Sequence, residues 1–324
     1  MVSKFRAFAR FMFVSSLIAA PAIAQACSSC GCTLNSDWAS QGYAAGEGIF
    51  VDLRYDYINQ TELRSGRNAV NRGGIAFPAG DETQQLTRSR TYNLGLDYRP
   101  VEDWAVNLQV PYLDRFHTTV AGGDTDVSAS QTNGIGDVRL VGRFMGLSED
   151  RNSGLQLGLK LPTGKFHTDF NAGPQTGTPL DRGLQSGTGT TDLILGAYRF
   201  GELSAISEKL NYFAQVQFQQ SLKSRENFKP GSATNLNLGI RYNLTETVSP
   251  NLQINVRNER RESGSNADVA NSGFILMYLS PGVTLNIAKS LVVYGFVQLP
   301  IYQRVNGLQI EPRYTASVGI RYAL

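Results

Sequence analysis

The chain has 324 residues, of which 41% are hydrophobic and 18% charged, and its formal net charge is +3. No stretch approaches the roughly 20 consecutive apolar residues of a membrane-spanning helix. The chain contains 33 Gly, 14 Tyr and only 3 Cys, and many short runs alternate in polarity. These features predict a single all-β domain.

Residues 1–26 have the pattern of a secretory signal peptide. Three basic residues precede an apolar run at residues 11–20, and Ala24 and Ala26 supply the small side chains required at a cleavage site. The segment holds three of the 30 Lys and Arg residues and none of the 27 Asp and Glu residues, so the remainder carries no formal net charge. A nucleic-acid partner is therefore not expected.

A compact cysteine motif, Cys27-Ser-Ser-Cys30-Gly-Cys32, follows the predicted cleavage site. Three interpretations stay open: lipidation of Cys27, a disulfide that leaves one thiol free, or a tentative soft-metal site formed by Cys27, Cys30 and Cys32. A c-type haem is not expected, because Gly31 occupies the position where the attachment motif needs His. Apart from this soft metal, no cofactor is predicted.

Residues 27–47 are predicted to form a Cys-containing leader on the periplasmic side. The tether at residues 33–47 is polar and has too few apolar side chains to fold alone. It is long enough to fold back into a barrel as a partial plug or to extend into the periplasm. A leader of this kind could bind a periplasmic redox or metal-handling partner.

Alternation of polarity begins near residue 48 and continues to residue 324, which defines the predicted barrel domain (48–324). In its clearest hairpin, Leu155, Leu157 and Leu159 alternate with Gln156 and Lys160. This period of two is typical of strands with one apolar and one polar face, as in membrane barrels. The predicted strands cover residues 49–57, 92–98, 104–110, 136–144, 154–161, 190–200, 212–219, 235–242, 252–259, 272–286, 291–302 and 311–324.

The connections between these twelve predicted strands alternate in length. Those after the odd-numbered strands begin near residues 60, 114, 163, 222, 263 and 304, and the first three are the longest; the others, near residues 100, 149, 204, 246 and 288, are short. Gram-negative outer-membrane barrels have short periplasmic turns and longer extracellular loops. The sequence therefore predicts a transmembrane antiparallel up-and-down β-barrel of about 12 strands in the cell outer membrane, in contact with its lipid.

The last predicted strand places Tyr314, Val318, Ile320, Tyr322 and Leu324 on one face. This pattern resembles the C-terminal signal by which the outer-membrane assembly machinery recognises barrel proteins, although a terminal Phe is commoner there. The assembly machinery is accordingly an expected partner.

Three glycine-rich segments resemble a known family: NGIGDVRLVGRF (133–144), GLQLGLKLPTGKF (154–166) and SGTGTTDLILGAYRF (186–200). Together they are similar to the outer-membrane barrel transporters named for the MetA-pathway of phenol degradation, a porin-like family. The resemblance implies passage of aromatic or other small organic molecules. The cysteine motif is not part of that family pattern.

The polar faces of the predicted strands are expected to line the lumen. Interlocked polar side chains fill any narrow barrel, and rings of charge also set the selectivity of a pore. The strands at 272–286 and 291–302 are apolar on both faces, so either a plug covers their inner side or the lumen has an apolar wall. The predicted pore-lining residues are Asp52, Arg54, Asp137, Arg139, Arg143, Lys160, Arg241, Arg257, Glu259, Phe296 and Arg321.

Catalysis is not expected. The two histidines, His117 and His167, fall in predicted outer loops, and no nucleophile–base pair accompanies them. The predicted function is a channel for passive passage of small, aromatic or amphipathic organic solutes. The alternative is a barrel that anchors a periplasmic redox or soft-metal-handling partner through the cysteine leader.

Overall fold

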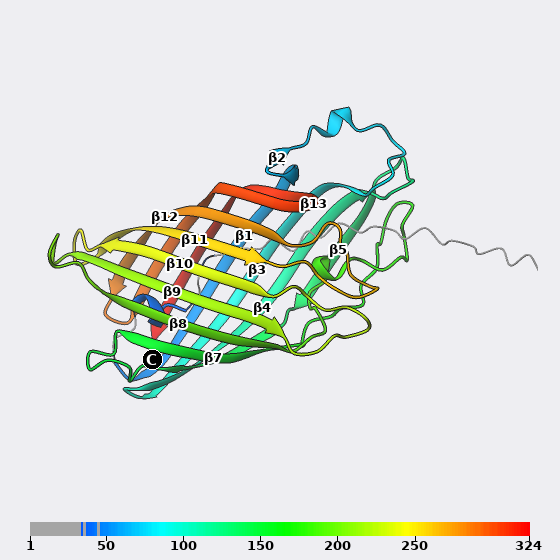
Figure 1. The fold of residues 1–324 in the computed structure, drawn as a ribbon. Helices are drawn as coiled ribbons and strands as arrows, with labels where there is room; N and C mark the ends of the chain where they lie inside the picture. Colours follow the sequence, from blue (N-terminus) through cyan, green and yellow to red (C-terminus); the bar gives the residue numbers. More distant parts are fainter. Residues whose placement is uncertain (1–33, 35–36, 44–45) are drawn as a thin grey trace, which may run out of the picture.

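The computed structural model describes residues 34, 37–43 and 46–324, which form an antiparallel β-barrel (Figure 1). Helical structure in this part of the chain is limited to three 3₁₀ turns: η1 (Ala39–Gln41), η2 (Arg72–Gly74) and η3 (Arg182–Leu184). No helix among the described residues is both long enough and apolar enough to cross a membrane.

Thirteen labelled strands make up the sheet of the described chain. They are β1 (Gly48–Gly66), β2 (Asn68–Ala69), β3 (Thr83–Val101), β4 (Trp104–Val120), β5 (Ser128–Ile135), β6 (Val138–Phe144), β7 (Ser153–Leu161), β8 (Asp192–Glu202), β9 (Leu210–Ser221), β10 (Ala233–Tyr242), β11 (Val248–Glu259), β12 (Phe274–Ala288) and β13 (Leu291–Ala323).

Eleven of these labelled strands close into a ring, each antiparallel to its neighbours, while β2 pairs with β1 and β5 pairs with the loop-side half of β4. The last label, β13, covers two strands of the wall. Residues 291–305 pair with β12 and residues 305–323 pair with β1, so the chain reverses near Gly307, which has a φ of +60°. The chain therefore crosses the wall twelve times, and the predicted antiparallel up-and-down barrel is confirmed.

The two faces of the wall differ sharply in polarity. In β7, Leu155 and Leu157 are 49% and 62% exposed on the outer face, whereas Gln156 and Lys160 are buried on the inner face. The same alternation runs through the other wall strands, since every second residue of a strand points to the same face. An apolar outer surface of this extent is favourable in lipid and unfavourable in water.

The connections at one end of the barrel are on average longer than those at the other end (Figure 1). We call the end with the shorter connections the turn end and the other the loop end. At the turn end the connecting residues are 102–103, 145–152, 203–209, 243–247 and 289–290. At the loop end they are 67–82, 121–127, 162–191, 222–232 and 260–273.

Two predicted loops are partly strand. The predicted loop at 60–86 is shortened because β1 continues to Gly66 and β3 begins at Thr83, and β4 and β5 occupy most of the predicted loop at 114–134. These extensions are mostly polar, with isolated apolar residues such as Leu63 and Phe116, so their composition resembles that of a loop. They still pair as strands, because backbone hydrogen bonding requires no apolar face.

Candidate functional site

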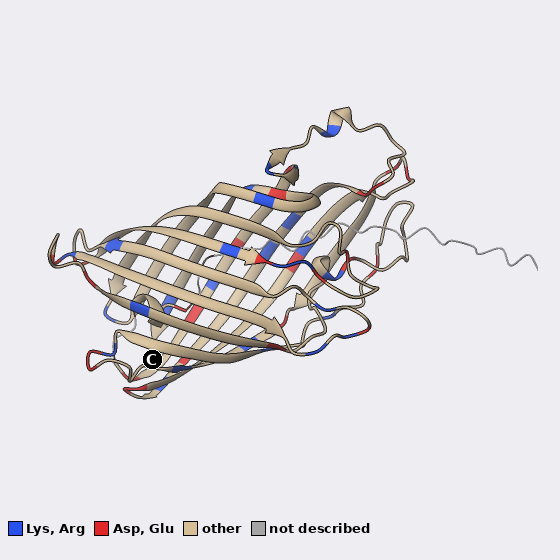
Figure 2. Ribbon diagram, in the orientation of Figure 1, with Lys and Arg blue, Asp and Glu red and all other residues tan. Residues whose placement is uncertain are grey.

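The interior of the barrel is the candidate functional site. Lys, Arg, Asp and Glu residues occur along the strands as well as in the loops (Figure 2). Several charges of the inner face are paired: Arg54 Nε lies 3.0 Å from Asp56 Oδ2, and Lys160 Nζ lies 3.1 Å from Asp137 Oδ2. Paired and hydrogen-bonded charges tolerate burial far better than isolated ones.

All eleven predicted pore-lining residues contact other inward-facing side chains. Asp52 accepts a hydrogen bond of 3.0 Å from Tyr294, Arg139 donates to Gln219, and Arg321 lies over the Phe50 ring. Their proposed role in selecting solutes remains a prediction. The other predicted residues and their partners are Arg54 with Asp56, Asp137 with Lys160, Arg143 with Asp97, Arg241 with Tyr43, Arg257 with Glu259, and Phe296 with Trp38.

A short non-strand segment, residues 37–43, lies inside the barrel, and we call it the lumen segment. Its Asp37 accepts hydrogen bonds from Arg143 of β6 and Gln156 of β7. Arg143 is fully buried, and its Nη2 also lies 2.7 Å from each carboxylate oxygen of Asp97 in β3. Arg143 is thus clamped between a carboxylate of the segment and a carboxylate of the wall.

An aromatic contact holds the same segment against the opposite side of the barrel. The Trp38 ring lies 4.2 Å from that of Tyr294 and 6.2 Å from that of Phe296, centroid to centroid, and Leu34 joins this buried cluster. Tyr294 and Phe296 belong to the stretch that is apolar on both faces in sequence. Trp38 covers the inner side of these two residues.

Tyr43 completes the attachment. Its hydroxyl donates to Asn251 of β11 and lies 3.3 Å from Thr284 Oγ1 of β12, while the Arg241 guanidinium stands 4.0 Å above its ring centroid. Together with the Asp37 and Trp38 contacts, these bonds tie the lumen segment to strands on most of the barrel circumference. The 3₁₀ turn η1 of the segment also packs against β8 and β9, so the segment lies inside the lumen along the inner wall from β6 to β13.

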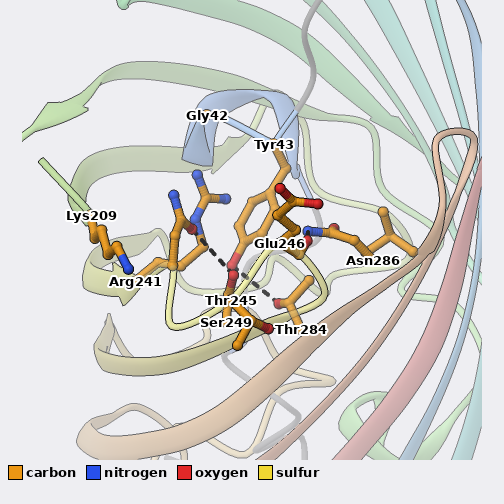
Figure 3. A pocket seen from close by; sticks show the side chains of 11 residues that line it. Gly42, Tyr43, Lys209, Arg241, Thr245, Glu246, Ser249, Thr284 and Asn286 are labelled. Atoms are coloured by element: carbon orange, nitrogen blue, oxygen red, sulfur yellow. Dashed lines mark hydrogen bonds between the residues drawn. The ribbon is translucent and has the colours of Figure 1, made fainter.

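A polar cavity of about 700 Å³ lies between the lumen segment and the turn end (Figure 3). Tyr43 forms its inner boundary, and Lys209, Arg241 and Glu246 contribute charges of both signs. A second cavity, of about 620 Å³, lies among the loops of the opposite end. The lumen segment is situated between the two.

The three family-like segments of the sequence meet at one point near the loop end. Asp137 accepts hydrogen bonds from the backbone N–H of Gly164 at 3.1 Å and from that of Thr188 at 3.0 Å, besides its ion pair with Lys160. Gly164 and Gly187 are in such close contact that a Cβ on Gly164 would lie 2.7 Å from the Gly187 Cα. We call this cluster the Asp137 knot; it explains both glycines and the aspartate as packing requirements.

The two histidines do not belong to an assembled site among the described residues. His117 was predicted in a loop, which is wrong: it lies buried in β4, with Nδ1 2.8 Å from Thr87 Oγ1. His167 is in a loop, and its Nε2 is 2.9 Å from Glu226 Oε2. Among the described residues, no three His, Cys, Asp or Glu side chains are grouped to hold a metal ion. Residues 1–26 and the three cysteines lie outside the described residues, so the signal peptide and the metal or disulfide interpretations stay predictions.

Sequence reasoning missed the side chains that fix the lumen segment. Asp37, Trp38 and Tyr43 stand in a polar tether without periodicity, and their partners are distant in the chain: Arg143 is 106 residues from Asp37. The available signal was the presence of two aromatic residues in an otherwise polar stretch.

Comparison with known proteins gives a clear result for the fold. An outer membrane channel from Pseudomonas putida F1 superposes with a TM-score of 0.63 and 13% identity, covering 90% of this chain and 99% of that one. The chain is an outer-membrane β-barrel. The translocator domain of autotransporter NalP from Neisseria meningitidis (TM-score 0.46, 10% identity, 87% of this chain and 90% of that one) and the Ralstonia pickettii toluene transporter TbuX (0.43, 11%, 86% and 90%) are more distant.

No protein-family model and no curated protein sequence matches the chain. The resemblance to the MetA-pathway family therefore stays a prediction.

Proposed function

We propose that this outer-membrane barrel is a channel for the passive passage of small organic solutes, and that the lumen segment closes it in this conformation. The observation that carries the proposal is the clamp on Arg143. A barrel that serves only as a scaffold can fill its interior with wall side chains. Here a separate segment occupies the lumen, bound by side-chain contacts, with a cavity on either side.

The side chains around the segment suit solutes with one apolar and one polar end. Displacement of the lumen segment would uncover the aromatic rings of Tyr294 and Phe296, and the paired charges of Arg54 and Asp56 lie on the same inner wall. Binding sites for small organic molecules commonly combine apolar surface with a few placed polar groups. Aromatic or amphipathic molecules are therefore the proposed solute class.

Liposome swelling and planar-bilayer conductance test the proposal on wild type and the variant Asp37→Asn. The variant removes one charge from a buried pair, a loss of about 3 kcal/mol, so displacement of the lumen segment should increase on the order of a hundredfold. Higher conductance and faster swelling are expected. Asp126→Asn, an exposed loop carboxylate, should behave as wild type.

The absence of flux through both proteins would contradict the channel proposal. If folded wild type and folded Asp37→Asn both pass no solute, the channel proposal fails. The barrel would then be better explained as an anchor for a periplasmic partner, with Cys27, Cys30 and Cys32 as the place to search for it. Heat-modifiable migration on a gel establishes that each protein is folded.

A further inference from the structure

The loop-end cavity of about 620 Å³ is bounded by three loops, at residues 162–191, 222–232 and 260–273. Its volume falls within the roughly 300 to 1,000 Å³ of typical small-molecule sites. Phe166, Leu180 and Val269 give it an apolar lining, while Asp181 and Asp268 contribute carboxylates. The cavity thus combines apolar surface with negative charge.

Asp181 is the unusual member of this lining. Its side chain is 5% exposed, and its Oδ2 has no hydrogen-bond partner among the described residues. Asp268, by contrast, accepts a hydrogen bond of 3.0 Å from the Asn271 backbone N–H. A buried carboxylate oxygen without a partner is costly, so a ligand that supplies a donor is strongly favoured there.

The surroundings of Asp181 add negative charge and supply no cation in contact. Burial first, and then the carboxylates of Glu262, Asp268 and Glu82, raise the pKa of Asp181 well above its usual value. Arg182, the one Lys or Arg among the described lining residues, directs its Nη2 to Glu226 at 2.6 Å. No Lys or Arg of the described chain forms an ion pair with Asp181.

We propose that the loop-end cavity captures small organic cations, with the ammonium group at Asp181 and the apolar body against Phe166, Leu180 and Val269. An ammonium supplies the donor that Oδ2 lacks and offsets the repulsion among the carboxylates. A bare metal ion fits less well, because the described residues offer no group of three His, Cys, Asp or Glu ligands. The proposal names a solute class for the proposed channel, and its biological role rests on that channel function.

Calorimetric titration of the purified, folded protein tests the capture site with two probes of equal size. Phenethylammonium is expected to bind at least about tenfold more tightly than neutral 2-phenylethanol, which corresponds to about 1.4 kcal/mol. Asp181→Asn should abolish this difference, and Asp126→Asn should preserve it. Because Asp181→Asn relieves repulsion between buried carboxylates, the variant is expected to fold, and heat-modifiable migration checks this.

Equal binding of the two probes would overturn the proposal, as would undiminished phenethylammonium binding by folded Asp181→Asn. Complete displacement of phenethylammonium by stoichiometric Ca²⁺ would also overturn it, in favour of a metal site. The measurement needs no transport and so separates the two proposals. Phenethylammonium binding without solute flux in liposomes would contradict only the channel function. Solute flux without phenethylammonium binding would contradict only the capture site.

Discussion

At the scale of single residues, Gly42 shows how closely the lumen segment fits. It ends η1 with a φ of +78°, in the left-handed region that favours glycine, and a Cβ at this position would lie 2.8 Å from Phe200 Cδ2. Gly46 has a similar φ of +89° but no atom within 4 Å of a Cβ position. The two glycines share the same conformational requirement and differ in steric contact.

Gly42→Ala should therefore displace the lumen segment and raise conductance, whereas Gly46→Ala should not. Both variants carry backbone strain of about 1–2 kcal/mol, because a left-handed conformation disfavours any Cβ. Only Gly42→Ala adds the collision with Phe200. Single-channel recording of the two variants beside wild type makes the comparison. If the two variants have equal conductance, then either backbone strain alone displaces the lumen segment or neither substitution displaces it.

Phe296→Gln tests the apolar part of the lumen. Phe296 is 3% exposed and packs with Trp38 and Tyr294, so replacing it with a polar chain of similar length removes aromatic surface without opening a large void. Because Phe296 also contacts Trp38, the informative quantity is the ratio of aromatic to small-sugar uptake by liposomes, which should fall several-fold. Equal slowing of both solutes would indicate obstruction or misfolding instead of lost aromatic contact.

At the scale of elements, the Asp137 knot joins the break between β5 and β6 to the long loop after β7. Asp137 receives two backbone N–H groups of that loop as well as Lys160. Each hydrogen bond to a charged group contributes about 1.5–3 kcal/mol. The knot is thus expected to order residues 162–191, which also bound the loop-end cavity.

Asp137→Ala should consequently loosen this loop and leave the barrel wall intact. Limited proteolysis of the folded protein is expected to cut within residues 162–191 at least about tenfold faster, since the loss of one such bond already corresponds to more than 1.4 kcal/mol. Glu208→Ala, in an exposed turn at the other end, is the matched control. Unchanged cleavage in Asp137→Ala would show that other contacts order the loop.

The sequence predicted those parts of the strands whose outer face contacts lipid. Where one face is apolar, as at Leu155 and Leu157, alternation with period two identifies the strand and its orientation. Where both faces are polar, as in β5 (Ser128–Ile135), the pattern disappears although the backbone pairing does not. The clamp of Asp37 on Arg143 could not be predicted from the sequence, because it depends on how the closed ring brings distant residues together.

At the scale of the whole molecule, the segregation of turns and loops assigns an orientation. Outer-membrane barrels direct their longer loops outward, so the loop end, with the 620 Å³ cavity, should face the exterior. The turn end, with the cavity below Tyr43, should face the periplasm.

Cell-surface labelling checks this orientation. A cysteine placed at Thr125, in an exposed loop-end connection, should react with an impermeant maleimide on intact cells, and one placed at Glu246, in a turn, should not. Cys27, Cys30 and Cys32 are replaced by Ser beforehand to remove background. Labelling at Glu246 with protection at Thr125 would mean that the barrel has the inverted topology.

The pairing of β13 with β1 has a consequence for how the barrel assembles. The pair Phe50 and Ala323 joins opposite ends of the barrel sequence, so the ring has the very high contact order of a structure that closes with its last strand. Until then β1 presents an open edge that can pair with any other strand. Folding should therefore be slow and error-prone without a template. The seam between the first and last strands is the site at which a chaperone must prevent incorrect strand pairing.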